Sequence, residues 1–340
     1  MDQENYYKKK IIVITGAAGS IGRQLVKQII KYDIESVRIL DNNETGLFDL
    51  EHELNSNKIR PLIGDIRDKD RLLFAFEGAD IVFHAAALKH VPLCEFNPFD
   101  AVKTNVIGTQ NVIEAALAKN VEKVINISTD KASNPTNVMG ATKLVAERLI
   151  ISASYYQGTK KTKFSNIRFG NVLNSRGSVL PLFEQQIKNK GPVTVTDKEM
   201  TRFIMSIPNA VDLIIKAGVL AQGREIFILK MPSIRIIDLA ETMIETLSKK
   251  FNLQQSEISI KYIGKRGGEK IHEELMTFDE IQNAIENDTL YILLPHKYYE
   301  TDISYEIPAG FKKLELREVS SNQGPSLSKA AIKKILESIE

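Results

Sequence analysis

Residues 10–22 read KIIVITGAAGSIG and decide the fold. The first six residues form a short apolar, β-branched run that ends at a glycine, which is typical of a buried parallel strand. Helical periodicity follows from Ser20 to about Lys31. Gly16, Gly19 and Gly22 lie between the two, in GxxGxxG spacing. The stretch therefore predicts a strand, a glycine-rich turn and a helix.

Such a turn is typical of dinucleotide binding. Gly16 would permit the tight turn, Gly19 would let the backbone approach a pyrophosphate, and Gly22 would let the helix pack closely on the strand. The helix N-terminus supplies free N–H groups and a partial positive charge. Glycines also form ordinary loops, so the strand and the helix on either side carry the argument. The expected cofactor contacts in the turn are Gly16, Ala18, Gly19, Ser20, Ile21 and Gly22.

An acidic residue ends the second expected strand, over 37–41. Asp41 lies 19 residues beyond Gly22, where a carboxylate accepts hydrogen bonds from an adenosine ribose and repels a 2′-phosphate. This favours NAD as the cofactor over NADP. The alternative is that Asp41 caps the next helix together with Asn42 and Asn43.

Strands and helices alternate along the first half of the chain. Further strands are predicted at 59–63, 80–86, 121–128 and 163–170, with helices at 44–54, 68–77, 98–119 and 140–156. This rhythm indicates βαβ units and a Rossmann-like α/β fold, with a doubly wound, mostly parallel sheet and helices on both faces. Residues 1–170 are expected to form the NAD-binding domain, with later segments returning to it. Asp65, after the third strand, is a candidate for the adenine edge or another helix cap.

The alternation loosens after Gly170. Short helices are predicted at 207–221, 236–250 and 269–276, and strands at 227–230 and 258–263. We interpret 171–300 as mainly a smaller α+β lobe that binds the substrate. Residues 301–340 read as a C-terminal extension with a final helix over about 327–338.

Composition excludes several classes of protein. The 340 residues hold 45 Lys and Arg against 43 Asp and Glu, a net charge of +2, so bulk charge gives no reason to expect nucleic-acid or anionic-membrane binding. Basic clusters at 8–10 and 160–163 are expected to be solvated faces. One cysteine and scattered histidines predict neither disulfides nor a metal site. No apolar run approaches the roughly 20 residues of a membrane span, and the start lacks a signal peptide, so a cytoplasmic protein is expected.

A second group of polar residues follows the fifth strand. That strand ends in Ser128-Thr129-Asp130-Lys131, and Met139 and Lys143 open the next helix. Ligands of doubly wound sheets bind at the carboxyl ends of the strands. An acid and an amine side by side there could divide the general acid and general base roles. A surface Asp–Lys pair at a strand exit fits the pattern equally well.

Taken together, these motifs resemble the extended short-chain dehydrogenase/reductase superfamily. The resemblance rests on TGxxGxIG, Ala85-Ala86-Ala87, Asn105, Ser-Thr-Asp-Lys and the lysine four residues after Met139. Within the superfamily the chain resembles the nucleotide-sugar 4,6-dehydratases of the polysaccharide-biosynthesis type, which act on UDP-N-acetylglucosamine. The likeness runs from about residue 10 to 276 and is carried by AAALKHVPLCEFNP, KTNVIGTQN, STDKASNPTNVMGATK, IRFGNVLNSRGSVLP, TDKEMTRFIMS and KRGGEKIHEEL.

One position departs from the superfamily pattern. The usual Tyr-x-x-x-Lys, whose tyrosine deprotonates the reacting hydroxyl, is here Met139 and Lys143. A thioether cannot be that base. This weakens an assignment as a simple alcohol dehydrogenase or 4-epimerase, whereas a subgroup of the dehydratases also carries methionine. Thr129 is then the candidate to relay the C4 hydroxyl proton, and Lys143 would hold the nicotinamide ribose.

The resemblance implies a three-step reaction. C4 of the sugar gives hydride to NAD; Lys131 removes the C5 proton while Asp130 protonates the departing C6 hydroxyl; hydride then returns to C6. NAD would be tightly bound and recycled on the enzyme. The remaining cofactor contacts implied are Asp41, Asn42, Asp65, Ile66, Ala85, Ala86, Ala87, Asn105 and Lys143. The implied nucleotide-sugar contacts are Lys89, His90, Asn171, Ser178, Val179, Arg202, Arg266 and Glu269, the two arginines for the diphosphate.

Several alternatives stay open at this point. The substrate could carry UDP or GDP, and the product would be a 4-keto-6-deoxy sugar nucleotide for bacterial or archaeal surface glycan or nonulosonic acid synthesis. Asp41 with Met139 favours the subgroup that retains the C5 configuration. A nucleotide-sugar epimerase and a redox-inactive NAD-binding sensor or scaffold are the rival functions. The superfamily often pairs the helices expected at 98–119 and 140–156 between subunits, so a homo-oligomer, dimer or larger, is expected.

Overall fold

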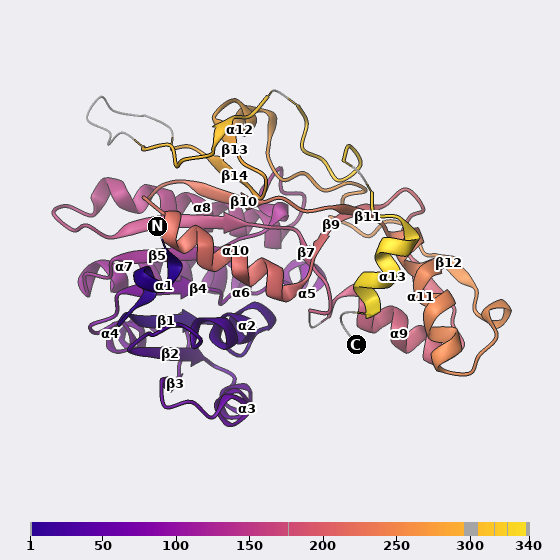
Figure 1. Cartoon of the computed structure of the whole chain (residues 1–340), viewed down its shortest axis with the longest axis horizontal. Helices are drawn as coiled ribbons and strands as arrows, with labels where there is room; N and C mark the ends of the chain where they lie inside the picture. The colour runs from indigo at the N-terminus through magenta and orange to yellow at the C-terminus, as the bar shows by residue number, and fades with distance from the viewer. Residues whose placement is uncertain (1, 176, 296–304, 316, 325, 338–340) are drawn as a thin grey trace.

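A ten-stranded mixed sheet forms the centre of the molecule (Figure 1). The computed structural model describes residues 2–175, 177–295, 305–315, 317–324 and 326–337. The parallel part of the sheet runs in the order β3 (Ile59–Ile63), β2 (Ser36–Asp41), β1 (Ile11–Thr15), β4 (Ile81–His84), β5 (Lys123–Ile127), β6 (Lys163–Arg168) and β10 (Ile226–Leu229). The strands that follow at this edge are antiparallel: β14 (Leu290–Leu293), β13 (Ala284–Glu286) and β15 (Lys312–Lys313). The doubly wound, mostly parallel sheet is confirmed.

Helices cover both faces of this sheet. One face buries apolar side chains under α2 (Ser20–Ile29), α3 (Glu44–Leu54) and α10 (Ile207–Leu220). The other face packs against α4 (Lys69–Ala75), α7 (Gly108–Ala118) and α8 (Val138–Tyr156). The short α1 (Gln3–Tyr7) joins the first layer, because the Tyr7 hydroxyl donates to the Ile215 carbonyl of α10 at 2.7 Å. Burial on both faces explains why β1, β4 and β10 are nearly continuous apolar runs.

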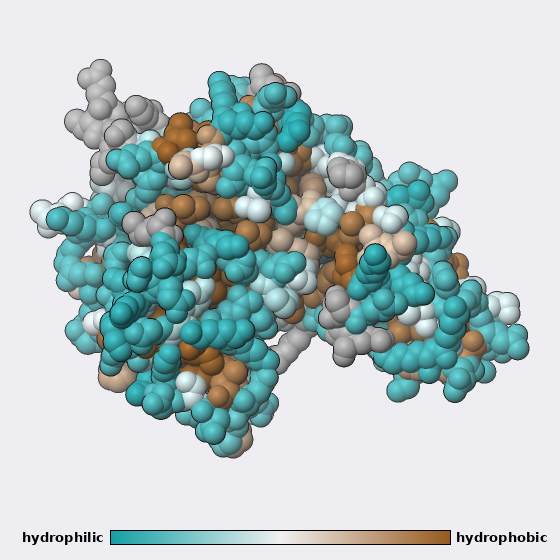
Figure 2. Space-filling model, viewed as in Figure 1, coloured by the Kyte–Doolittle hydropathy of each residue, from teal (hydrophilic) through white to brown (hydrophobic). Residues whose placement is uncertain are grey.

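A smaller lobe lies at one end of the sheet (Figure 1). Its core is formed by α9 (Val179–Lys188), α11 (Ile236–Lys250) and α13 (Lys329–Glu337), with the two-stranded pair β8 (Val193–Val195) and β12 (Ile260–Tyr262). A three-stranded sheet of β7 (Asn171–Val172), β9 (Thr201–Met205) and β11 (Ser233–Arg235) connects the lobe to the main sheet. Figure 2 shows a recess between the lobe and the N-terminal half.

The long helix expected at 98–119 has three parts. It begins as α6 (Pro98–Ala101), continues through a π-helical turn over Val102–Ile107, and ends as α7. A shorter helix, α5 (Val91–Phe96), precedes it and was not expected. The wider π turn contains the buried Asn105, whose side chain bonds back to the loop after β4, and such turns are often found at functional sites.

A buried ion pair fixes α8 against β6. Arg168 at the end of β6 is fully buried, and its Nη2 lies 2.7 Å from Oε2 of Glu147 in α8. Its Nη1 lies 3.0 Å from Oε2 of Glu280 in α12 (Phe278–Gln282). A buried cation that is paired on both sides is held strongly in place. This pairing therefore sets the position of the first turns of α8, which carry Met139 and Lys143.

The helix expected at 269–276 is wrong, because this segment is an irregular strap with a single bridge from Glu274 to Ser320. Its backbone groups bond to neighbouring elements rather than forming a helical ladder: the Ile271 carbonyl accepts from the Thr201 N–H, and the Leu275 N–H donates to the Val319 carbonyl. The final helix is α13, and position 338 of the expected range lies outside the described residues. Positions 301–304, 316, 325 and 339–340 of the expected C-terminal extension, and 296–300 at the end of the expected lobe, also lie outside the described residues.

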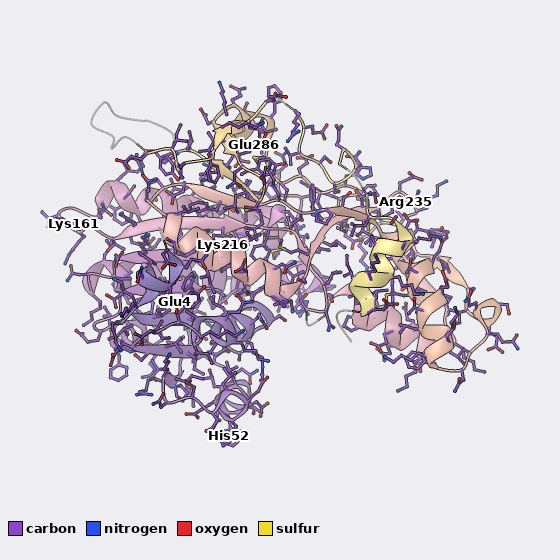
Figure 3. The ribbon with its side chains drawn as sticks, viewed as in Figure 1. Glu4, His52, Lys161, Lys216, Arg235 and Glu286 are labelled. Carbon is purple, nitrogen blue, oxygen red and sulfur yellow. The ribbon has the colours of Figure 1, made fainter. Side chains whose placement is uncertain are left out.

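Lysines from both predicted basic clusters are exposed at the surface. Lys161 projects from the periphery of the molecule, and Lys8 and Lys9 are also exposed (Figure 3). Among the described residues, no helix combines the length and the apolar character needed to cross a bilayer. Within the same residues, no group of three or more His, Cys, Asp or Glu side chains is arranged to hold a metal ion.

Candidate active site

The glycine-rich turn lies at the carboxyl end of β1 and requires glycine at two positions. Gly16 has a φ of 70°, and a Cβ there would lie 2.5 Å from the Ala86 backbone nitrogen. A Cβ on Gly22 would lie 2.2 Å from the Gly16 carbonyl oxygen. Real Cβ atoms do not tolerate either distance, so any side chain would separate the turn from α2 or from the loop after β4.

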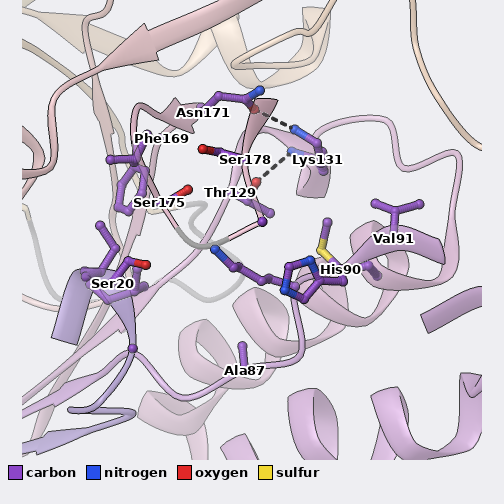
Figure 4. Close-up of a pocket in the computed structure, with 18 of the residues that line it drawn as sticks. Ser20, Ala87, His90, Val91, Thr129, Lys131, Phe169, Asn171, Ser175 and Ser178 are labelled. Atoms are coloured by element: carbon purple, nitrogen blue, oxygen red, sulfur yellow. Dashed lines mark hydrogen bonds between the residues drawn. The ribbon is translucent and has the colours of Figure 1, made fainter. Parts of the chain in front are cut away.

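A cavity of about 610 Å³ opens at this edge of the sheet (Figure 4). This volume is within the range of small-molecule sites. The predicted residues that line it are Gly16, Gly19, Ser20, Ile21, Gly22, Ala85, Ala87, Lys89, His90, Thr129, Lys131, Met139, Lys143, Asn171, Ser178, Val179 and Arg202. A connected depression of about 280 Å³ is lined by Asp41, Asn42, Asp65, Ile66 and Ala86. The turn and both cavities fit an extended dinucleotide.

Asp41 is positioned toward the turn rather than capping a helix. Its Oδ2 accepts from the Ala18 backbone N–H at 2.9 Å, and its Oδ1 accepts from the Asn43 N–H at 2.9 Å. The N-cap of α3 is Asn43, whose side chain accepts from the Gly46 N–H at 3.0 Å. The carboxylate thus faces the depression where an adenosine ribose would lie.

Asp65 is held by an arginine that the sequence analysis missed. Arg67 donates from its backbone N–H and from its guanidinium to the Asp65 carboxylate, and the guanidinium bonds hold the pKa of Asp65 below its usual range. Asp68, not Asp65, caps α4 through the Arg71 N–H. Arg67 lines the same depression as Asp41, with its charge already neutralised.

Asn105 does not line either cavity. Its Oδ1 accepts from the Leu88 N–H at 2.8 Å, and its Nδ2 donates to the Leu88 carbonyl and to Thr142 Oγ1, each at 3.0 Å. The side chain therefore ties the loop after β4 to α8. We assign it as a positioning residue for that loop, whose Ala85 and Ala87 do line the cavity.

Lys143 and Met139 lie on the cavity side of α8. Lys143 Nζ donates to the Ile127 carbonyl at 2.7 Å. Burial lowers the pKa of Lys143 to about 8, although Glu147 one turn later opposes the shift. Met139 packs with Cys94 and Ala101 in a small apolar cluster and faces the cavity. Met139 thus places an apolar thioether at the cavity wall, with no acid or base of its own.

Thr129, Asp130 and Lys131 are linked by hydrogen bonds. Thr129 Oγ1 donates to Asp130 Oδ1 at 2.9 Å, and Lys131 Nζ donates to the same oxygen at 2.9 Å. Asp130 is 0% exposed and its Oδ2 has no partner, whereas Thr129 and Lys131 line the cavity. The surface-pair alternative is excluded: Asp130 is a buried carboxylate that reaches the cavity through its two neighbours.

Lys131 has two further partners on the side away from Asp130. Its Nζ lies 3.2 Å from Asn171 Oδ1 (Figure 4) and 3.3 Å from Oε1 of Glu273. Burial alone would lower the pKa of Lys131, but the charges of Asp130 and Glu273 outweigh burial and raise it. The lysine is therefore held as an ammonium at rest. We call Thr129, Asp130, Lys131, Asn171 and Glu273 the proton cluster.

The predicted diphosphate residues lie in different settings. The Arg202 guanidinium donates to the carbonyls of Thr201, Lys270 and Ile271 at 2.7 to 3.0 Å, so it anchors the strap over 269–276. Arg266 and Glu269 line a further cavity of about 600 Å³, which shares Lys131, Asn171 and Arg202 with the first. The donors of Arg202 are largely used inside the protein.

The N-terminus of α9 faces the first cavity. Ser178 is its N-cap, and the Ser178 hydroxyl is buried without a hydrogen-bond partner in the part of the chain that the structure describes. The helix dipole and free N–H groups favour an anion at such a position. Lys89 and His90 lie across the cavity, with a Cβ on Gly177 only 2.6 Å from the His90 ring. Lys89 and burial lower the pKa of His90, burial being the larger cause.

Glu273 is the main site residue that sequence reasoning missed. It follows Lys131 by 142 positions, and its segment was interpreted as a helix. The pair Glu273-Glu274 was the only local signal, and it does not indicate which of the two is buried.

The chain matches the family described as "Polysaccharide biosynthesis protein" over residues 12–295. It is 58% identical over 338 residues to an uncharacterized membrane protein of Methanocaldococcus jannaschii, covering 99% of this chain and 98% of that one. It is 39% identical over 306 residues to a UDP-N-acetylglucosamine 4,6-dehydratase (inverting) of Campylobacter jejuni, covering 89% and 88%. A crystal structure of Pen from Bacillus thuringiensis superposes with a TM-score of 0.90 at 43% identity, covering 98% of each chain.

Other relatives show the spread of activities and lengths. A UDP-glucose 4-epimerase of Rickettsia bellii is 38% identical over 332 residues, covering 96% of this chain and 95% of that one. The chain spans 53% of the capsular polysaccharide biosynthesis protein CapD of Staphylococcus aureus, at 42% identity over 92% of its own length. DesIV, a dTDP-glucose 4,6-dehydratase of Streptomyces venezuelae solved with NAD bound, shares the fold at 22% identity and a TM-score of 0.66, covering 77% of this chain and 86% of that one.

Proposed function

Because the chain belongs to the polysaccharide biosynthesis family of extended short-chain dehydrogenases/reductases, we propose that it is an NAD-dependent 4,6-dehydratase of UDP-N-acetylglucosamine. The proposal rests on one observation: Thr129, Asp130 and Lys131 form a hydrogen-bonded acid–base group in the cavity that begins at the dinucleotide turn. The named dehydratase relatives support the reaction class.

The cofactor fits the turn and the depression beside it. The glycines that tolerate no Cβ, the N-terminus of α2 and the Asp41 carboxylate form the features expected of an NAD site. When bound, NAD would accept hydride from C4 of the sugar and return it to C6. Lys143 would hold the nicotinamide ribose next to the reacting carbon, because it lines the same cavity as the turn.

Thr129 replaces the missing tyrosine as the contact for the C4 hydroxyl. Its hydroxyl is bonded to Asp130 at 2.9 Å, so it can accept the sugar proton while passing its own proton to the carboxylate. Asp130 then holds that proton until the C6 hydroxyl departs as water. The oxygens on C4 and C6 of a hexose are neighbours across C5, and one hydroxyl can contact both. The buried Asp130 therefore needs only Thr129 to reach them.

Lys131 is the proposed base for C5. Once C4 is a ketone, the C5 proton is acidic, and a neutral amine at the cavity wall can remove it and later return it. Asn171 Oδ1 fixes the Lys131 amine at 3.2 Å, which keeps it directed along the cavity. Because an ammonium cannot act as a base, turnover requires Lys131 to lose its resting proton first.

The diphosphate is proposed to lie between the N-terminus of α9 and Arg266. The unpartnered Ser178 hydroxyl would donate to a phosphate oxygen there, and Val179 supplies a backbone N–H in the first turn of the helix. Arg266 and Glu269 line the outer cavity, where the guanidinium would bind phosphate and the carboxylate the nucleoside ribose. Arg202 would act indirectly, by holding the strap that carries Glu269 and follows Arg266.

The decisive experiment is incubation of the purified protein with UDP-N-acetylglucosamine, followed by mass spectrometry of the sugar nucleotide. We expect the loss of one water without net consumption of NAD. A parallel reaction with GDP-N-acetylglucosamine tests which nucleotide base the protein accepts in its substrate. An isomer of unchanged mass would assign the chain as an epimerase. An unchanged substrate in every reaction would leave a redox-inactive NAD-binding sensor or scaffold as the remaining function.

A further inference from the structure

The proposed dehydration creates a problem in counting protons, and the inference that follows rests on that proposed function. At rest, Asp130 is a carboxylate and Lys131 an ammonium, in contact at 2.9 Å. Oxidation at C4 releases a proton through Thr129 to Asp130. Lys131 must at the same time become neutral to take the C5 proton. Asp130 then holds the proton from C4, and Lys131 must hold none beyond its neutral amine. The proton that leaves Lys131 therefore needs a third group to hold it.

Glu273 is placed to hold this proton. It is 2% exposed, and its Oε1 lies 3.3 Å from Lys131 Nζ. Its Oε2 is buried and has no hydrogen-bond partner among the described residues. An unpaired carboxylate oxygen in the interior is costly when charged and much less costly when the group is neutral. Glu273 is thus a buried group with a direct contact to Lys131 and a reason to accept a proton.

We propose that Glu273 takes the ammonium proton of Lys131 during turnover and returns it at the end of each cycle. In the forward step an N–H bond of Lys131 breaks and an O–H bond of Glu273 forms, so an ammonium and a carboxylate become an amine and a carboxylic acid. No electrons are transferred. Because Glu273 acts through Lys131, it is a positioning and proton-storing residue for the catalytic lysine.

The cycle closes with this third group. Asp130 first gains the C4 proton, and Glu273 gains the proton of Lys131. Lys131 then takes the C5 proton while Asp130 gives its own to the leaving C6 hydroxyl. After C6 is reduced, Lys131 returns a proton to C5 and recovers its resting proton from Glu273. Every group regains its initial state, and the only product besides the sugar is water.

The charged groups around Glu273 and Lys131 bring the proton affinities of these two side chains closer together. Burial raises the pKa of Glu273, Asp130 raises it further, and Lys131 and Arg202 oppose the shift. When Asp130 becomes protonated, Lys131 loses one of its two anionic neighbours, which weakens its hold on its own proton. The protonation of Asp130 in the first step thus favours the transfer that the second step requires.

The strap that carries Glu273 is fixed on both sides. The Ser321 N–H donates to the Glu273 carbonyl at 2.8 Å, and the Leu275 N–H donates to Val319 at 3.0 Å. Arg202 binds the carbonyls of Lys270 and Ile271, and its Nε lies 3.7 Å from Glu273. This fixation explains why an irregular segment can hold a carboxylate within hydrogen-bond distance of Lys131.

The test compares Glu273→Gln with Glu274→Gln in the NAD-loaded 340-residue chain. The neighbouring Glu274 bonds to Asn134 and lies outside the proton cluster, so it serves as the matched control. We expect Glu273→Gln to lower kcat by about 100-fold or more with KM changed only a few-fold. Reduced cofactor should build up on the enzyme, seen in its near-ultraviolet absorbance, because C4 is oxidised but C5 keeps its proton. Glu273→Asp should recover part of the turnover.

Turnover of Glu273→Gln at the wild-type rate would overturn the proposal, and so would a uniform loss without reduced cofactor. A second measurement needs no substrate: an NMR titration of isotopically labelled lysine side chains, with Lys131→Arg to assign the signal. Glu273→Gln should lower the pKa of Lys131, whereas an unchanged pKa would contradict the coupling. If the wild type dehydrates no sugar nucleotide, the proposed function fails, and this titration still decides whether Glu273 and Lys131 share a proton.

Discussion

The dinucleotide turn and the proton cluster lie in one cavity but are built in opposite ways. The turn needs only residues 15–22 and Asp41, and two of its glycines act through the side chains they lack. The proton cluster joins Thr129, Asp130 and Lys131 to Asn171 and Glu273 from distant parts of the chain, and it acts through charge. Under the proposed function, one region binds the cofactor through its backbone, and the other moves protons through its side chains.

This difference predicts different responses to mutation. A Cβ added in the turn should clash with the neighbouring backbone and weaken cofactor binding at any pH. A change in the cluster leaves the cavity intact but alters which group carries a proton, so it affects kcat more than KM. The two regions can therefore be separated by measuring cofactor retention and turnover on the same variants.

The largest effect is expected at Thr129. Thr129→Val preserves shape but removes the hydroxyl that connects Asp130 to the cavity, so kcat should fall by about 1000-fold with NAD still bound. Thr129→Ser keeps the hydroxyl and is the matched control, with a loss of a few-fold. Steady-state kinetics and the NAD content of each purified variant are the measurements. Near-normal turnover of Thr129→Val would show that Asp130 reaches the sugar without it.

The next effect belongs to the turn. Gly22→Val places a side chain 2.2 Å from the Gly16 carbonyl, and such overpacking typically costs about 1 to 3 kcal/mol. NAD affinity should fall by about 100-fold, measured by calorimetry on protein stripped of cofactor. Gly324→Ala, where nothing lies within 4 Å of the new Cβ, should bind NAD normally. Turnover at saturating NAD should recover, in contrast with Thr129→Val.

The same contrast explains what could be predicted from the sequence. The strand–turn–helix at 10–22 is a local pattern, so its position and its glycines were predictable from periodicity and spacing. Thr129, Asp130 and Lys131 were found because they follow a strand, where ligands bind in this fold. Glu273 was missed because its position depends on Arg202 and Ser321, which lie far away in the sequence.

Two other expectations were drawn from local patterns alone. The segment 269–276 has the composition of a helix, but its backbone groups bond to β9 and to the strand-like segment near Val319, so tertiary contacts override its propensity. Arg202 was expected to bind phosphate because arginine suits that ligand. In the structure its donors bind carbonyl groups of the strap. Propensity predicted a helix in the first case, and long-range contacts give an irregular strap instead. Residue type predicted phosphate binding in the second case, and that role of Arg202 stays a prediction although most of its donors are used within the protein.

A smaller effect is expected from pH at Lys143, which lies between the two regions. Its pKa of about 8 means that the ammonium becomes neutral as the pH rises through 8, so the proposed hydrogen bond from Lys143 to the ribose should weaken. NAD affinity should decrease about three- to tenfold from about pH 7 to about pH 9. Titration calorimetry across this range is the measurement, and Lys143→Met should remove most of the dependence. An equally steep profile in that variant would assign the titration to another group.

The smallest effect is expected at Asp41 and concerns selectivity. Its carboxylate accepts from Ala18 and Asn43 and faces the depression for the adenosine ribose, so a 2′-phosphate would meet a negative charge there. Asp41→Asn removes the charge and keeps an oxygen for the Ala18 N–H, so the ratio of NAD to NADP affinity should fall by about tenfold with little change in stability. Competitive binding of the two dinucleotides measures this ratio. Arg67 would supply a partner for the phosphate only by releasing Asp65, and Asp41→Asn combined with Asp65→Asn should therefore lower the ratio further than either substitution alone. If the double variant discriminates like the wild type, the turn selects its cofactor by backbone shape alone, and the contrast with the charge-based proton cluster becomes complete.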